Sequence, residues 1–344
     1  MRVRIRRARA VVVLAALAAL LPPAGPASPA DRVPEARVVG ERVVSERAGA
    51  SGLVDLTVDS PALGRRAAVR LATPDGWDER RPGDRWPVLY LLPGGDGDHL
   101  SWTRDYGVQD LPELRNVLVV MPEMPLFGFY TNWWNGGAGG PPGVERFHLD
   151  EVRPLLEREY GAGTRRTVAG ESQGGFGALS YSARRPGMFR AAASFSGYVH
   201  PLQHPHAVKA GMDHLGLDWK AIWGDPVEQR ANWVAHDPYY LAEQLRGMPV
   251  RLSAGDGTAG VLDPPDVEPD EEIPGLEDPA DPFDDDVISP TETLMERESR
   301  AMADRLREAG AQVTTHFYPG THSPAYWERE LHHALPMLLK PLVG

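Results

Sequence analysis

No cysteine occurs among the 344 residues of the chain. This absence excludes disulfide bonds, a catalytic thiol and the attachment of a lipid to a cysteine. The stability of the folded chain must therefore come from a conventional hydrophobic core, and the hydrophobic content of 42% is ordinary for such a core.

Long apolar runs are also scarce. The N-terminus has five arginines by position 9, then an apolar run of 12 residues from Ala10 to Leu21, then small residues and prolines. A membrane-spanning helix needs about 20 apolar residues, whereas this pattern is typical of a secretory signal peptide. We therefore predict a signal peptide over residues 1–30, a secreted mature protein and no stable membrane insertion.

The chain has fewer basic residues (36 Lys and Arg) than acidic residues (48 Asp and Glu). The formal net charge is −12, and removal of residues 1–30, which contain five arginines and no acid, changes it to −17. A surface of this sign disfavours nucleic acid and anionic lipid as partners. We expect the mature chain to act as a monomer on a small molecule, without a cofactor.

Short apolar runs alternate with helical patterns along most of the chain. Residues 31–50 lack a clear period and are expected to form a flexible lead-in, and the alternating segments 53–58 and 66–72 predict a hairpin. Further strands are expected at 87–92, 116–121, 166–170, 190–195, 249–254 and 313–318, and helices at 146–159, 174–185, 292–309 and 325–340. This alternation predicts an α/β fold in one domain, residues 51–344, with a mostly parallel central sheet flanked by helices.

One segment, residues 261–290, lacks any basic residue but holds twelve acidic residues and seven prolines. With so few hydrophobic residues it cannot bury enough surface to offset the entropy lost on ordering, so we predict a mobile insertion between a strand and a helix. Asp284, Asp285 and Asp286 do not have the ligand spacing of a calcium loop, and we expect no metal there.

The stretch "TVAGESQGGFGAL", residues 167–179, places Gly170, Ser172 and Gly174 in the spacing Gly-x-Ser-x-Gly between a predicted strand and a predicted helix. A nucleophilic serine in such a turn needs a strained backbone and small neighbours, which glycines permit. The amides at the start of the helix would stabilise a developing oxyanion. The alternative interpretation is a glycine-rich turn that happens to contain a serine.

An α/β-hydrolase also needs an oxyanion loop before the serine and a histidine after it. Gly94 and Gly95 directly follow the strand predicted at 87–92, and the backbone N–H of Gly95 is expected to join that of Gln173 in binding the oxyanion. His322 follows the last predicted strand, where the general base must lie to reach the serine.

The other histidines fit this role less well. His332 and His333 fall on the last predicted helix and His236 in a loop, so surface or capping positions are expected for them. The group His200, His204 and His206 lacks the spacing of a zinc site, and we interpret its members as loop residues. No metal is therefore expected.

The acidic partner of the histidine is open from the residues alone. Asp256 follows the strand at 249–254, which is the usual position in this fold, and Glu292 lies beyond the acidic insertion. Glu296 and Glu298 are nearby competitors, and spacing does not choose among the four.

Several segments in a fixed order resemble one family. They are "LTVDSPALGRRAAVRL", "VLYLLPG", "VVMPEMPLFGFYTNWW", the Ser172 turn, "AAASFSGYVHP", "AIWGDP" and "GTHSPAYWERELHHALPML". Together they resemble the antigen 85 mycolyltransferase family, secreted actinobacterial α/β-hydrolases of the esterase D type. The resemblance implies a Ser-Glu-His triad of Ser172, Glu292 and His322, and oxyanion amides from Gly95 and Gln173.

The sequence departs from that family where members bind trehalose. Pro93 and Asp96 stand where those members have an Asp and an Arg, Pro324 replaces a Trp, and His200 occupies a position that contacts sugar. These departures weigh against trehalose as the acyl acceptor.

We expect substrate contacts from Asp96, Trp102, Trp133, His200 and Ser323. The aromatic residues Trp102, Phe129, Tyr130, Trp133 and Trp327 could equally line an acyl cleft or belong to the core.

The predicted function is a secreted serine esterase or acyltransferase that acts on ester, lipid or glycolipid substrates through an acyl-enzyme. Water or an alcohol such as a sugar or glycerol would accept the acyl group. The alternative is a catalytically idle adhesin or carbohydrate-binding protein on the same fold.

Overall fold

A computed structural model describes residues 42–48, 52–95, 97–125 and 127–343 of the chain. The predicted signal peptide lies outside these residues, as does the lead-in up to residue 41. The expectation of a flexible lead-in is wrong for strand β1 (Arg42–Ala48), which pairs antiparallel with β2 (Leu53–Ser60). The alternation of apolar and polar residues is weak in this segment, because β1 is an edge strand that packs one side chain, Val43, against the core.

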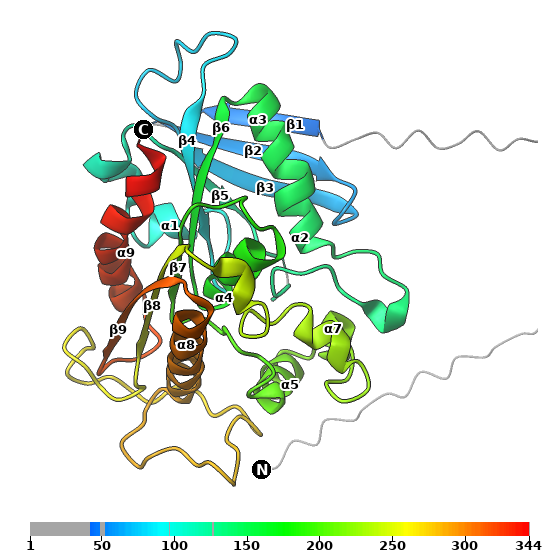
Figure 1. Cartoon of the computed structure of the whole chain (residues 1–344), viewed down its shortest axis with the longest axis vertical. Coiled ribbons are helices and arrows are strands. Elements are labelled where there is room, and N and C mark those ends of the chain that lie inside the picture. The colour runs from blue at the N-terminus through cyan, green and yellow to red at the C-terminus, as the bar shows by residue number, and fades with distance from the viewer. Residues whose placement is uncertain (1–41, 49–51, 96, 126, 344) are drawn as a thin grey trace, which may run out of the picture. The chain divides into compact units, whose positions relative to one another are not determined.

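Nine strands of the described chain form one sheet in the order β1-β2-β3-β5-β4-β6-β7-β8-β9 (Figure 1). The remaining strands are β3 (Arg65–Ala72), β4 (Trp86–Leu92), β5 (Leu118–Pro122), β6 (Ala162–Glu171), β7 (Ala192–Phe195), β8 (Pro249–Gly255) and β9 (Gln312–Tyr318). The pairs from β1 to β3 and on to β5 are antiparallel, and β5, β4, β6, β7, β8 and β9 run parallel to one another. The predicted mostly parallel sheet is confirmed.

Four parallel strands, β4, β5, β6 and β7, contribute to two hydrophobic cores, because successive side chains of a strand point to opposite faces of the sheet. In β4, Val88 and Tyr90 belong to the larger core, whereas Leu89 belongs to the smaller one. Strands buried on both faces therefore appear in the sequence as continuous apolar runs.

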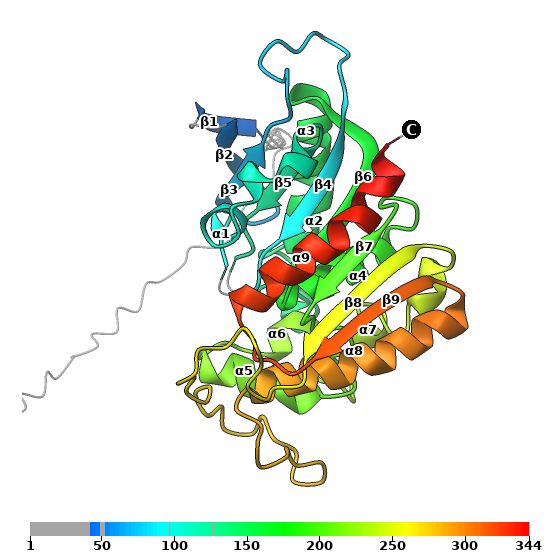
Figure 2. The same ribbon diagram turned by 90° about the vertical axis from the view of Figure 1, so that its left-hand side faces the viewer.

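Helices cover both faces. They are α1 (Ser101–Arg104), α2 (Val144–Arg146), α3 (Arg153–Glu159), α4 (Gln173–Arg184), α5 (Pro205–His214), α6 (Lys220–Trp223), α7 (Arg230–Val234), α8 (Pro290–Ala309) and α9 (Pro324–Leu339). Helices α4 and α8 pack on the face of the larger core, and α9 lies across the other face (Figure 2). Within the described residues, no helix is long and apolar enough to cross a bilayer.

The acidic insertion carries no helix or strand between residue 261 and the start of α8 at Pro290. It runs beside α5 and α8 in both views (Figures 1 and 2). Leu276 is buried, and Ile273 and Phe283 pack against the larger core. The prediction of a mobile insertion did not anticipate these three packed apolar side chains, which lie where the segment passes the two helices.

The crossing from β6 to α4 leaves no room for side chains. A Cβ atom on Gly174 would lie 2.1 Å from the carbonyl oxygen of Leu92, and one on Gly170 would lie 2.2 Å from the carbonyl of Gly174. These distances are far below van der Waals contact, so α4 can start close above the sheet only because both residues are glycine.

We expect Gly174→Ala to destabilise the fold, because the clash is with backbone atoms that cannot turn aside. The cost should reach or exceed the upper end of the roughly 1–3 kcal/mol typical of overpacking. Gly211→Ala is the matched control, since a Cβ atom added to that helical glycine would have nothing within 4 Å of it. Thermal unfolding of both variants tests this, and an unchanged midpoint for Gly174→Ala would contradict it.

Candidate active site

Ser172 lies at the turn between β6 and α4, at the carboxyl end of the central parallel strands. Its backbone has φ 54° and ψ −124°, a positive φ that non-glycine residues rarely adopt. The Ser172 N–H donates to the carbonyl of Phe195 at 2.9 Å, which fixes the turn to the end of β7. Such strain at a serine between a strand and a helix is typical of a nucleophile whose hydroxyl is held out of the sheet.

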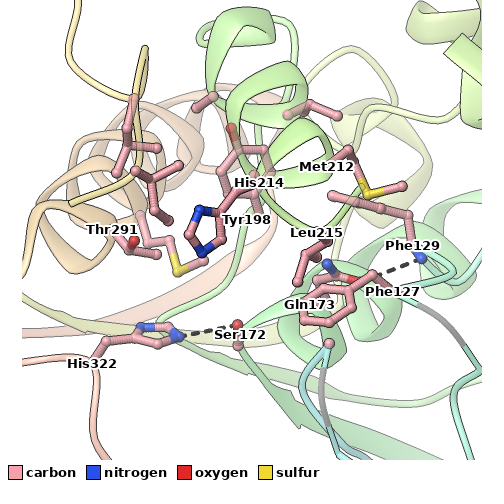
Figure 3. A pocket seen from close by; sticks show the side chains of 17 residues that line it. Phe127, Phe129, Ser172, Gln173, Tyr198, Met212, His214, Leu215, Thr291 and His322 are labelled. Carbon is pink, nitrogen blue, oxygen red and sulfur yellow. Dashed lines mark hydrogen bonds between the residues drawn. The ribbon is translucent and has the colours of Figure 1, made fainter. Parts of the chain in front are cut away.

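His322 lies in the loop between β9 and α9 and faces Ser172. Its Nε2 is 3.1 Å from Ser172 Oγ (Figure 3). The backbone N–H of His322 donates to Ser289 Oγ at 3.2 Å, and the indole of Trp327 meets the imidazole edge to face, with ring centroids 4.7 Å apart. The ring is thus positioned by a hydrogen bond to its backbone and by its contact with the indole.

Glu292 occupies the first turn of α8 and is fully buried. Its Oε2 lies 2.6 Å from His322 Nδ1, and its Oε1 accepts hydrogen bonds from Ser196 Oγ at 2.7 Å and from the N–H of Gly255 at 2.5 Å. The carboxylate is therefore held in place, and the N-terminal end of the helix favours its negative charge. Because Nδ1 faces a carboxylate, the proton of a neutral imidazole belongs on Nδ1 and Nε2 is left as the acceptor toward Ser172.

Burial and charge act on the pKa of His322 in opposite directions. Burial lowers it, but the hydrogen bond and the negative charge of Glu292 outweigh burial, with a further contribution from the charge of Glu171, so the pKa is raised. A raised pKa makes the imidazole a better proton acceptor.

The three competing acids lie elsewhere. The carboxylate of Asp256 accepts from the N–H and the hydroxyl of Thr258, at 2.9 and 2.7 Å. Glu296 pairs with Arg300, and Glu298 lies 3.1 Å from His204 Nδ1. Of the acids weighed from the sequence, Glu292 is the one that the structure brings to His322.

The expected oxyanion loop lies beside the serine. Gly95 and Gln173 line the same cavity as Ser172. The loop is fastened by Glu171, whose Oε1 accepts the N–H of Gly94 at 2.7 Å, and by the hydroxyl of Tyr130, which donates to the carbonyl of Pro93 at 2.5 Å. Position 96, where Asp96 was expected to contact substrate, lies outside the described residues.

A cavity of about 340 Å³ opens above Ser172. Figure 3 shows Phe127, Phe129, Tyr198, Met212 and Leu215 arranged around it, with Ser172 and His322 on one side. It lies between α5, the start of α8 and the acidic insertion. Its lining is dominated by apolar side chains, so the reacting hydroxyl faces a space suited to hydrocarbon rather than to sugar.

Four expected substrate contacts are not part of this cavity. Trp102 is fully buried in the smaller core against Tyr106, and Trp133 packs against the larger core. His200 is buried, with its Nδ1 2.8 Å from Asp237 Oδ2, and Ser323 precedes the first turn of α9. These expectations are corrected: residue type at a loop does not tell a core or capping side chain from a cleft side chain.

Three residues important to the site were missed from the sequence. Ser196 holds Glu292 and accepts a hydrogen bond from the indole N–H of Trp327 at 3.0 Å, and Glu171 fastens the oxyanion loop. The position of Glu171 inside the Gly-x-Ser-x-Gly motif, directly before Ser172, is the sequence feature that could have identified it as a residue of the site. Leu276 lines the cavity from the insertion, and no local pattern points to it.

One group of described residues, His316, Glu330 and His333, has ligand atoms close enough together to hold a metal ion. Glu330 already pairs with Arg251 at 2.8 Å and with Arg329 at 2.9 Å. Two guanidinium groups on the single carboxylate neutralise it and repel a cation, so this arrangement favours an ion-pair cluster over a metal site.

Residues 60–338 match the family described as "Putative esterase". The chain belongs to this esterase family. Two esterases of Mycobacterium tuberculosis, MT1326 and Rv1288, are each 30% identical to it over 291 residues, which is 82% of this chain and 58% of theirs. The chain thus spans just over half the length of these relatives. The MPT51 antigen of Mycobacterium leprae is 31% identical over 204 residues, 58% of this chain and 63% of that antigen.

Solved structures share the fold of this chain. MPT51 (FbpC1) of Mycobacterium tuberculosis matches with a TM-score of 0.64 at 23% identity, over 83% of this chain and 97% of that one. The fluorophosphonate-binding serine hydrolase FphF of Staphylococcus aureus matches with a TM-score of 0.61 at 16% identity, over 84% and 98%. The predicted α/β-hydrolase fold and the resemblance to the antigen 85 and esterase D group are confirmed.

We expect Glu292→Gln to lower kcat for ester hydrolysis by about 10³–10⁴-fold, because an amide cannot stabilise the imidazolium and favours the wrong tautomer of His322. Asp256→Asn is the matched control and should stay close to the parent protein. Steady-state kinetics on p-nitrophenyl butyrate measures both, and a large loss confined to Asp256→Asn would reverse the assignment.

Proposed function

We propose that this protein is a secreted serine esterase that forms an acyl-enzyme on Ser172. The observation that supports this most directly is the unbroken line of hydrogen-bond distances from Ser172 Oγ to His322 Nε2 and from His322 Nδ1 to Glu292, facing an apolar cavity. A nucleophile, a base and a group that orients the base are the parts that acyl transfer requires.

In the first half of the reaction, Ser172 Oγ attacks the ester carbonyl while its proton passes to His322 Nε2. Glu292 stabilises the imidazolium through Nδ1–H, and the N–H groups of Gln173 and Gly95 bind the negative oxygen of the tetrahedral intermediate. The C–O bond to the leaving alcohol then breaks, and His322 gives its proton to the departing alkoxide.

In the second half, His322 removes a proton from water or from an alcohol, whose oxygen attacks the acyl carbonyl. The ester bond to Ser172 breaks, the serine regains its proton, and a carboxylic acid or a new ester leaves. The apolar lining supports an acyl group made of hydrocarbon. It offers little that favours trehalose, in line with the departures at Pro93 and Pro324.

Export through the predicted signal peptide and action as a monomer complete the proposal. The net charge of −17 that remains after removal of residues 1–30 supports a chain that avoids nucleic acid and anionic membranes. Digestion of an ester outside the cell would need no cofactor.

A fluorophosphonate probe should label the purified protein at one position, Ser172, because His322 activates that hydroxyl as a base. Peptide mass spectrometry locates the adduct, and Ser172→Ala should abolish it. Ser182→Ala is the matched control, because Ser182 is buried and its hydroxyl donates to the carbonyl of Ala178. This variant should be labelled like the parent protein. A parent protein that takes up no label would favour a catalytically idle binding protein instead.

The raised pKa of His322 predicts a pH dependence. The base must be neutral to accept the serine proton, so the inactivation rate with the same probe should fall as pH decreases through a pKa above the ordinary value of about 6.5. Glu292→Gln removes the hydrogen bond and the charge that raise this pKa, so the midpoint should move to lower pH. Asp256→Asn should leave the midpoint in place, and equal midpoints in all three proteins would contradict the prediction.

A further inference from the structure

The acidic insertion supplies one wall of the cavity above Ser172. Ile273 and Leu276 line that cavity together with residues of α5 and the start of α8, among them Met212 and Met295. The insertion therefore places apolar side chains in the space that a substrate bound at Ser172 would enter, although all of its charged residues are acidic.

We propose that Leu276 and Ile273 are specificity-determining residues that contact the acyl chain and limit its length, so that the substrates are esters of uncharged acyl groups of short to medium length. The proposal rests on the proposed esterase function. It assigns to the acidic insertion a role in substrate choice that the sequence alone did not indicate.

Contacts at several points fix this wall. Toward α5, His206 Nε2 lies 3.1 Å from the carbonyl oxygen of Leu276, so the ring N–H donates to it. Toward α8, Arg297 Nη1 lies 2.9 Å from Asp281 Oδ2, and its guanidinium stacks over Phe283. The turn that carries Ile273 and Leu276 thus contacts α5, and the residues that follow it contact α8.

A further tie connects the insertion to the catalytic histidine. The N–H of Asp270 donates to the carbonyl of Ile288 at 2.8 Å, and the hydroxyl of Ser289 donates to Asp270 Oδ2 at 2.5 Å while accepting the N–H of His322. Ile273 follows Asp270 by three residues. The wall is therefore placed relative to the reacting groups through one shared hydroxyl.

The size and charge of the surroundings determine the substrate class. The cavity volume of about 340 Å³ is near the lower end of the roughly 300–1,000 Å³ typical of small-molecule sites. The insertion around Leu276 holds twelve acidic residues. One of them, Glu271, is highly exposed, and its Oε1 lies 3.9 Å from Nε2 of His214, which lines the cavity. An acidic rim disfavours acyl groups that carry a carboxylate and favours release of the anionic product.

The test compares kcat/KM across p-nitrophenyl acetate, butyrate, octanoate, laurate and palmitate. For the parent protein we expect a rise of up to about fourfold per buried methylene until the chain meets the wall, and a fall beyond it. Leu276→Ala and Ile273→Ala should move the optimum to longer chains. Leu276→Trp should lower the ratio of octanoate to acetate hydrolysis by roughly tenfold, since it removes the space of about two methylenes.

Val261→Ala is the matched control, because Val261 belongs to the same insertion, is 89% exposed and is not part of the cavity. Its profile should coincide with that of the parent protein. Leu276→Met, which conserves volume, keeps the test informative if the alanine variant does not fold. Profiles that change in parallel for all chain lengths, or not at all, in Leu276→Ala, Ile273→Ala and Leu276→Trp would overturn the proposal.

A binding measurement separates this proposal from the proposed function. In Ser172→Ala, which cannot form the acyl-enzyme, calorimetric titration with octanol should show binding that Leu276→Trp weakens by roughly tenfold and that Val261→Ala leaves unchanged. If fluorophosphonate labelling fails but this difference is seen, the esterase function is wrong and the apolar wall stands. Labelling of Ser172 together with equal octanol binding in all variants would instead reject the wall.

Discussion

A single buried carboxylate organises the functional end of this molecule. Glu292 is fully buried, and a charge removed from water needs hydrogen-bond partners to remain ionised. Its partners come from three separate places: Ser196 after β7, Gly255 at the end of β8 and His322 after β9. The carboxylate therefore links the ends of three neighbouring strands to the first turn of α8, and the position of the histidine over Ser172 depends on all of them.

The parts of the fold that follow from repeating physical patterns could be predicted from the sequence. Strands such as β4 and β6, buried on both faces, leave continuous apolar runs, and helices such as α8 leave a periodic apolar stripe, so their approximate places could be predicted. The Ser172 turn could be found because its steric demand restricts the residue types at Gly170 and Gly174. Strand β1 was missed because an edge strand with one side chain on the core leaves no such pattern.

Side-chain roles that depend on tertiary contacts were harder to predict. Nothing local separates Asp256 from Glu292, since both lie near strand or helix ends; the difference is that Thr258 engages the first and His322 the second. The same holds for Trp102 and His200, because an aromatic ring or an imidazole near the end of a strand suits the core or a cleft equally well. The apolar residues of the insertion were overlooked for a related reason: composition averaged over the segment hides three well-placed side chains among many acids.

The insertion joins the end of β8 to the start of α8, and neither of its ends pairs with a strand of the described sheet. A change of length or sequence between residues 271 and 287 of this connection leaves the register of the sheet, the partners of Glu292 and the contact of Ser289 with His322 in place, while it alters one side of the cavity. Such a connection allows substrate range to diverge in evolution independently of the reacting groups, and it offers protein engineers a segment that can be exchanged between relatives as a cassette.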